Sequence, residues 1–262
     1  MINQKQQNVI KRWGFLAILC MFSQMAQGAK DQLLVVHGGW GSCFNGFSAQ
    51  STESAFQNAL KQLRAGFGAQ TPVRGLYTCL KVATIDQPQL IPYIYIDEKG
   101  RANQGTWSSD DMDLLVKRIT QKYPSEISLV GHSHGAWLAM KTLPKLPPVA
   151  SLFTIEPISP ENCGIQEFLE NRDRPILQRR QKIVDGCRQA PADINADEVS
   201  HLIQDDWFNF YQDPNFSMTA LHSSEIPEAQ NFPKYFGGGQ RAHMDAAYNA
   251  DVWRKIIVSI LK

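Results

Sequence analysis

Short apolar runs of strand length alternate with amphipathic stretches along most of this chain. The apolar, β-branched or aromatic runs, which predict strands, cover residues 33–36, 73–82, 91–96, 127–130, 149–155 and 207–211. The stretches that predict helices cover residues 52–64, 109–119 and 136–140 and the C-terminal segment through Ile260. Because strands and helices follow one another, the pattern predicts an α/β fold with a mostly parallel central sheet and helices on both faces.

Three polar segments interrupt this alternation. Residues 101–107 are polar and predict a loop, and residues 237–243 begin with three glycines and end with a histidine, which predicts a flexible loop. A longer polar and charged segment, residues 161–206, follows the strand at 149–155 and predicts an insertion. Residues 29–262 are therefore expected to form one domain that carries this insertion.

The first 28 residues have the pattern of a secretory signal peptide. Lys5, Lys11 and Arg12 give a positive start, residues 13–22 form an apolar core too short to span a membrane, and residues 26–28 offer small side chains for cleavage. We therefore expect this leader to be removed and the mature protein to be exported, to the periplasm or to the medium.

Cys20 raises the alternative of a lipoprotein anchor. Leu19 before it is bulky, whereas known lipoprotein signals carry Gly or Ala at that point, so we favour release over anchoring. No later stretch is long and apolar enough for a transmembrane helix, and no stable membrane span is expected after cleavage.

Charge and motif content exclude several functions. Removing the leader takes three basic and no acidic residues from 26 Lys+Arg and 25 Asp+Glu, which leaves 23 against 25. A nearly neutral chain gives no reason to expect a nucleic-acid partner. The histidines lack H-E-x-x-H spacing, the cysteines lack paired C-x-x-C spacing, and the glycine-rich segments lack a phosphate-loop lysine, so no metal or organic cofactor is predicted.

Four cysteines remain after the leader: Cys43, Cys79, Cys163 and Cys187. An even number in an oxidising compartment favours disulfides, and the sequence alone permits three pairings. We favour a bridge between Cys163 and Cys187, because both lie in one irregular segment, with Cys43 and Cys79 forming the second.

The most informative motif is Gly131-His132-Ser133-His134-Gly135, which stands between an apolar strand and a helix. A serine at the tip of such a turn has a strained backbone, and the flanking glycines let strand and helix pass close to it. The first amides of the helix point at the same place, where a developing oxyanion would lie. The turn therefore predicts a nucleophile, although a glycine-rich turn with a capping serine would have the same pattern.

With these flanks the chain resembles the α/β-hydrolase superfamily, and lipases and esterases in particular. The resemblance covers most of the chain after about the first thirty residues, and it implies a Ser-His-acid triad. Hydrolases of this superfamily often place a cap or lid after the strand that follows the nucleophile helix, where residues 161–206 lie. An exposed helical insertion that does not control access to the site is an equally favoured alternative for this segment.

In this resemblance Ser133 is the nucleophile and His243, before the last helix, is the general base. His222 is a rival base, but it precedes a strand-like segment rather than the terminal helix. Glu156, in Thr154-Ile155-Glu156-Pro157, resembles the acid of pancreatic-type lipases, with Glu in place of Asp. Asp213 ends the next strand, where most other superfamily members carry their acid, and stays the alternative.

The oxyanion hole is expected from two backbone amides. His37-Gly38-Gly39 follows the strand at 33–36 and resembles the oxyanion loop of lipases, with the amide of Gly39 as donor. The second donor is the amide of His134 at the start of the helix. The side chains of His132 and His134 are expected to pack or to contact substrate rather than to act as the base.

The sequence therefore predicts an exported serine hydrolase that cleaves carboxylic esters through an acyl-enzyme, with a small-molecule or lipid ester as substrate. It does not choose the acyl group, an ester over a thioester or amide, or the oligomeric state. A secreted binding protein that keeps the fold without turnover is the alternative, and the presence of both Ser133 and His243 argues against it.

Overall fold

The computed structural model describes residues 32–38, 73–79, 90–96, 102–108, 112–122, 125–159, 190–212, 223–236 and 242–261. The chain divides into two compact units, Met1–Lys30 and Asp31–Lys262, and every described residue belongs to the second unit. The predicted signal peptide and Cys20 lie outside the described residues, so export stays a prediction. Among the described residues, no helix combines the length and the apolar character that crossing a membrane requires.

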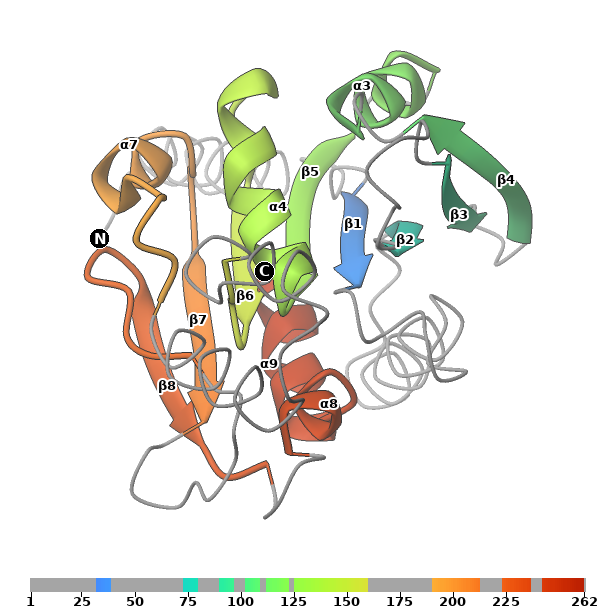
Figure 1. Cartoon of the computed structure of the whole chain (residues 1–262). Coiled ribbons are helices and arrows are strands. Elements are labelled where there is room, and N and C mark those ends of the chain that lie inside the picture. Colours follow the sequence, from blue (N-terminus) through green and yellow to red (C-terminus); the bar gives the residue numbers. More distant parts are fainter. Residues whose placement is uncertain are drawn as a thin grey trace, which may run out of the picture. The chain divides into compact units, whose positions relative to one another are not determined.

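An eight-stranded sheet, in the order β4-β3-β2-β1-β5-β6-β7-β8, organises the described part of the chain (Figure 1). Its strands are β1 (Gln32–Gly38), β2 (Val73–Cys79), β3 (Leu90–Ile96), β4 (Ala102–Ser108), β5 (Glu126–His132), β6 (Ser151–Ile155), β7 (Trp207–Gln212) and β8 (Gln230–Lys234). The neighbours in the run β2-β1-β5-β6-β7-β8 pair in parallel, whereas β3 pairs antiparallel with both β2 and β4. The mostly parallel sheet predicted from the sequence is confirmed.

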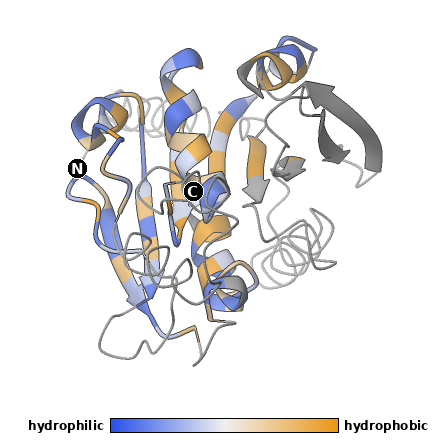
Figure 2. Ribbon diagram, in the orientation of Figure 1, coloured by the Kyte–Doolittle hydropathy of each residue, from blue (hydrophilic) through white to orange (hydrophobic). Residues whose placement is uncertain are grey.

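Alternate residues of the central strands face two different cores. Leu34 and Val36 of β1 join the cluster that contains Trp253 and Ile256 of α9 (Ala250–Ile260). A strand turns successive side chains to opposite faces, so the remaining apolar residues of β1 face the other way. Because β1 is buried on both faces, its sequence is apolar throughout Leu33–Val36, and Figure 2 shows it as a hydrophobic strand.

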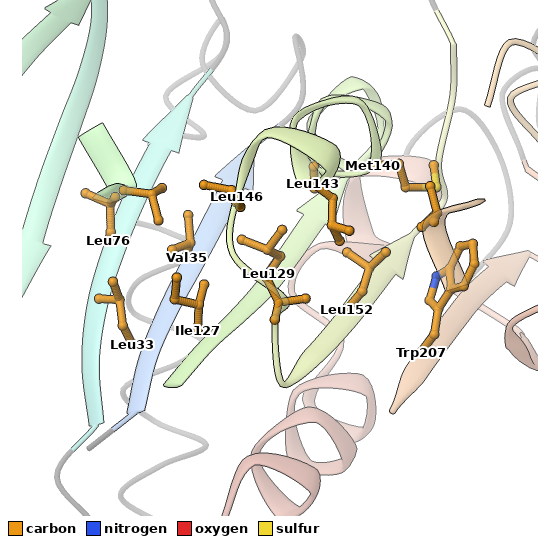
Figure 3. Close-up of a cluster of buried hydrophobic side chains, with 14 of the residues drawn as sticks. Leu33, Val35, Leu76, Ile127, Leu129, Met140, Leu143, Leu146, Leu152 and Trp207 are labelled. Atoms are coloured by element: carbon orange, nitrogen blue, oxygen red, sulfur yellow. The ribbon is translucent and has the colours of Figure 1, made fainter. Parts of the chain in front are cut away.

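The second core lies under helices α3 (Met112–Lys122), α4 (His134–Thr142) and the short α7 (Ala196–Ser200). Figure 3 shows its centre, where Leu33 and Val35 of β1 lie beside Leu129 of β5 and Leu152 of β6. Met140 of α4 packs on these strands and is 1% exposed. The two clusters confirm that helices cover both faces of the sheet.

The loop predicted for residues 101–107 is wrong. This segment forms β4, which pairs antiparallel with β3 from Ile96↔Ala102 to Leu90↔Ser108. A strand at the edge of a sheet needs only one partner for its backbone, so tertiary pairing can hold a polar sequence that propensity alone would leave as a loop. Strand and helix units therefore do not alternate throughout, because β2, β3 and β4 pair in succession.

The predicted insertion at 161–206 is described only from Ala190 onward. Helix α7 lies in this part, and its Val199 is 3% exposed in the core under α4. Asp193 accepts a hydrogen bond from Nε1 of Trp137 at 2.8 Å and lies 3.4 Å from Nζ of Lys141. The end of the segment is thus attached to α4, the helix that follows the sharp turn at Ser133, which we call the elbow.

Candidate active site

Ser133 lies on a sharp turn between β5 and α4, as the sequence predicted. Its φ is 58° and its ψ is −129°, a backbone conformation that non-glycine residues rarely adopt. A Cβ on Gly131 would lie 2.3 Å from Cα of Ala136, which explains why this position needs glycine. The Ser133 side chain makes no capping hydrogen bond to α4, so the alternative of a capping serine is not supported.

The backbone of Ser133 makes one hydrogen bond to the last residue of β6 and one to the segment that follows this strand. Its N–H donates to the carbonyl of Ile155 at 2.9 Å, and its carbonyl accepts from the N–H of Ile158 at 3.3 Å. We call these two hydrogen bonds the elbow clamp. Their partners Ile155 and Ile158 flank Glu156 and Pro157 in sequence, so the clamp fixes Glu156 relative to the turn that carries the serine.

Glu156 is completely buried and, like Ser133, has a positive φ, here 49°. Its N–H donates to the carbonyl of Phe210 at 2.7 Å, which ties it to β7. Its carboxylate accepts hydrogen bonds from the N–H of Gln212, at the end of β7, and from the N–H of Ser223 at 3.3 Å. Backbone amides that donate to a buried carboxylate favour its ionised form.

His243 lies against this carboxylate. Its Nδ1 is 3.3 Å from Oε2 of Glu156, and the residue is 4% exposed. An ionised carboxylate can only accept a hydrogen bond, so in this contact Nδ1 of His243 is the donor. His243 is the second residue of the short helix α8 (Ala242–Ala246), which corrects the expectation that it belongs to a flexible loop.

The histidines on either side of Ser133 are both buried. Nε2 of His132 lies 2.7 Å from the carbonyl oxygen of His243, and the two rings are 4.8 Å apart. Desolvation, and after it the proximity of His243, lowers the pKa of His132 to about 3 and that of His134 to about 4. Both imidazoles are therefore neutral at physiological pH.

The strand order explains how distant residues meet here. Neighbouring parallel strands end at the same edge, so Ser133 after β5, Glu156 after β6 and Gln212 at the end of β7 lie in succession along it. The contact between His132 and the backbone of His243 was not predicted, because nothing in the sequence separates it from ordinary packing. Neither were the amides that hold Glu156, since a backbone donor has no residue signature.

Several predicted site residues lie outside the described residues. They are Gly39 of the oxyanion loop, the alternative acid Asp213, the rival base His222, and Cys43, Cys163 and Cys187; Cys79 ends β2 without a described side chain. Of the predicted residues that are described, the structure brings Glu156 to His243, and Ile155 and Ile158 attach the segment that carries Glu156 to the Ser133 turn.

The strand order and the elbow after β5 define an α/β-hydrolase fold. No family model and no curated protein matches the sequence. Similar solved structures include an esterase from Pyrococcus furiosus, with 13% identity over 89% of this chain and 81% of that one and a TM-score of 0.43. MenH from S. aureus is 13% identical over 90% of this chain and 95% of MenH, with a TM-score of 0.44. The esterase domain of a Rhodothermus marinus protein is 12% identical over 88% of this chain and 84% of that domain, with a TM-score of 0.41.

We predict that Gly131→Ala pushes β5 and α4 apart at the Ser133 turn and destabilises the protein. The added Cβ would meet the backbone of Ala136, which cannot rotate away as a side chain could. The expected loss of stability is about 1–3 kcal/mol by analogy with overpacked cores, measured by urea unfolding. Adding Ala136→Gly should not rescue the variant, because the clash is with Cα and N rather than with the methyl group. Full stability of Gly131→Ala would contradict the geometry.

The two buried neutral histidines, His132 and His134, predict that the protein loses stability in acid. Their folded pKa values of about 3 and about 4 lie below the ordinary value of 6.5, so between these values the unfolded chain binds protons that the folded chain does not. The free energy of unfolding should therefore be highest above pH 6.5 and fall as the pH is lowered toward 4. Urea titrations across this range should show a shallower fall for His132→Gln. An equal fall in both proteins would contradict the burial of a neutral His132.

Proposed function

We propose that this protein is a serine hydrolase that cleaves carboxylic esters, with Ser133 as nucleophile, His243 as general base and Glu156 as the acid. One observation carries the proposal: the buried Glu156 carboxylate and His243 imidazole are in contact, and backbone hydrogen bonds of the flanking Ile155 and Ile158 attach this segment to a serine turn of positive φ. A serine hydroxyl is a weak nucleophile until a base takes its proton, and that base needs a carboxylate to fix its tautomer.

The arrangement supports acyl transfer in two steps. In the first, Nε2 of His243 takes the proton of Ser133 Oγ while Oγ attacks the ester carbonyl, and the protonated His243 then gives this proton to the departing alcohol. In the second, His243 takes a proton from water, the resulting hydroxide attacks the acyl-enzyme, and Ser133 Oγ leaves with the proton. Glu156 stays ionised and stabilises the imidazolium in both steps.

The negative charge on the carbonyl oxygen needs donors in place before the reaction begins. We propose the amides of Gly39 and His134 for this role. His134 is the first residue of α4, and the first amides of a helix have no partner within the helix and lie at its positive end. No metal or organic cofactor is needed for this chemistry, and the substrate class that fits it is a small-molecule or lipid ester.

We further propose that the protein works outside the cytoplasm, after removal of residues 1–28. The support comes from the sequence: a positive start, a short apolar core and small residues before the cleavage point. Four remaining cysteines fit an oxidising compartment, with Cys163–Cys187 as the favoured bridge.

The nucleophile is tested by Ser133→Ala. This variant should lose all hydrolysis of a short-chain chromogenic ester above the rate of a blank, because no other group replaces Oγ, while its circular dichroism stays unchanged. Ser200→Ala on α7, which also removes one serine hydroxyl, should keep wild-type activity. Undiminished hydrolysis by Ser133→Ala would refute the assignment, and a wild-type protein without any turnover would favour the binding-protein alternative.

The acid is tested by substituting Glu156, the alternative Asp213 and a control carboxylate, Asp245. Glu156→Gln keeps size but loses charge, and turnover should fall by about 10⁴, as for the orienting acid of a serine protease. Asp245→Asn is the matched control, because Asp245 lies on α8 two residues after His243 and is exposed, so its turnover should not change. If Asp213→Asn abolishes turnover while Glu156→Gln is nearly silent, the acid is Asp213.

A further inference from the structure

His132 stands immediately before the nucleophile, but its side chain reaches the residue proposed as the base. Its Nε2 lies 2.7 Å from the main-chain oxygen of His243, and its ring packs against the His243 ring at a centroid distance of 4.8 Å and an angle of 37°. The side chain is 3% exposed, so solvent does not compete for this contact. The serine turn and the base are thus connected directly.

The chemistry of the two atoms fixes the direction of the hydrogen bond. A backbone carbonyl can only accept, so Nε2 of His132 must carry a proton and donate it. Burial and the neighbouring His243 keep the pKa of His132 at about 3, so the ring is neutral and its other nitrogen, Nδ1, carries no proton. One tautomer of neutral His132 therefore satisfies the geometry.

We propose that His132 is a positioning residue, whose Nε2–H holds the main-chain carbonyl of His243 and so keeps the His243 imidazole directed with Nδ1 toward Glu156. The expected effect of His132 on turnover rests on the proposed function, whereas the contact between His132 and His243 is independent of it. The distance from His243 Nδ1 to Glu156 is 3.3 Å, at the long end for a hydrogen bond, whereas the bond from His132 is 2.7 Å. Helix α8 has only five residues, and a one-turn helix fixes its residues weakly on its own.

A neutral donor suits this position better than a charged one. His243 becomes positively charged when it accepts the serine proton, and a cation beside it would oppose that step. Lys or Arg could donate to the same carbonyl but would always carry that charge. A buried histidine supplies an N–H without a charge, and its ring covers one side of the His243 ring.

Two substitutions separate the hydrogen bond from packing. Gln places its amide nitrogen near the position of Nε2 in histidine, whereas the shorter Asn places its amide near Nδ1 and cannot reach the carbonyl of His243. His132→Asn should lower kcat by about 10²-fold with KM unchanged, as expected when a reacting group is displaced by about 1 Å. His132→Gln should retain most of the wild-type kcat. His201→Asn, at an exposed histidine, is the control and should match the wild type.

Proton NMR gives a readout that does not require turnover. The Nδ1 proton of His243, shared with Glu156, should give a downfield signal in the wild type and in His132→Gln, and the signal should be lost in His132→Asn. Nitrogen-15 spectra of the unmodified protein should show His132 as the neutral Nε2–H tautomer. If the wild type hydrolyses no ester, the proposed function fails, but these spectra still decide the role of His132.

Three results would overturn the proposal. One is a His132 ring protonated on Nδ1 rather than Nε2 in the wild-type protein, which needs no variant that folds. Another is a His132→Asn variant with the wild-type downfield signal. The third is an equal loss of kcat and of urea stability in the Gln and Asn variants, because that outcome would assign His132 to packing alone.

Discussion

The site depends on the elbow clamp, the two backbone hydrogen bonds that join Ser133 to Ile155 and Ile158. The first continues the parallel pairing of β5 with β6 by one residue beyond His132↔Ile155. Since the clamp flanks Glu156, the serine turn and the turn after β6 cannot move independently. A further bond from Glu156 N–H to Phe210 extends the attachment to β7, so the three strand ends form one rigid edge.

This rigidity offsets a local cost. Positive φ angles at Ser133 and Glu156 cost on the order of 1–3 kcal/mol each, and such conformations persist only where the surroundings determine them. Here the surroundings are two apolar cores, one under α9 and one under α3 and α4, which hold β5 and β6 from both faces. Ser133 and Glu156, the two residues with strained backbones, lie at the same sheet edge, and the burial of Glu156 and His243 strengthens the interaction between these two side chains.

The sequence predicted the parts of this arrangement that depend on local pattern. Short apolar runs predicted the central strands, because side chains alternate between the two faces of a strand and both faces of this sheet are covered. Gly131 and Ser133 predicted the elbow, because only glycine leaves room for strand and helix to pass so closely. Strand β4 was missed because pairing with β3, not its own polar residues, determines it. The location of His243 in α8 and its contact with His132 depend on packing between segments 111 residues apart, for which a single sequence has no signal.

The central claim is that Ser133 is an activated nucleophile rather than a strained turn residue. The most direct measurement is reaction of the purified protein with a fluorophosphonate, followed by intact-mass analysis and peptide mapping. The account predicts one adduct per chain, located on Ser133, because only a serine with a base in reach attacks phosphorus at an appreciable rate. No adduct, or an adduct on another residue with Ser133 unmodified, would contradict it.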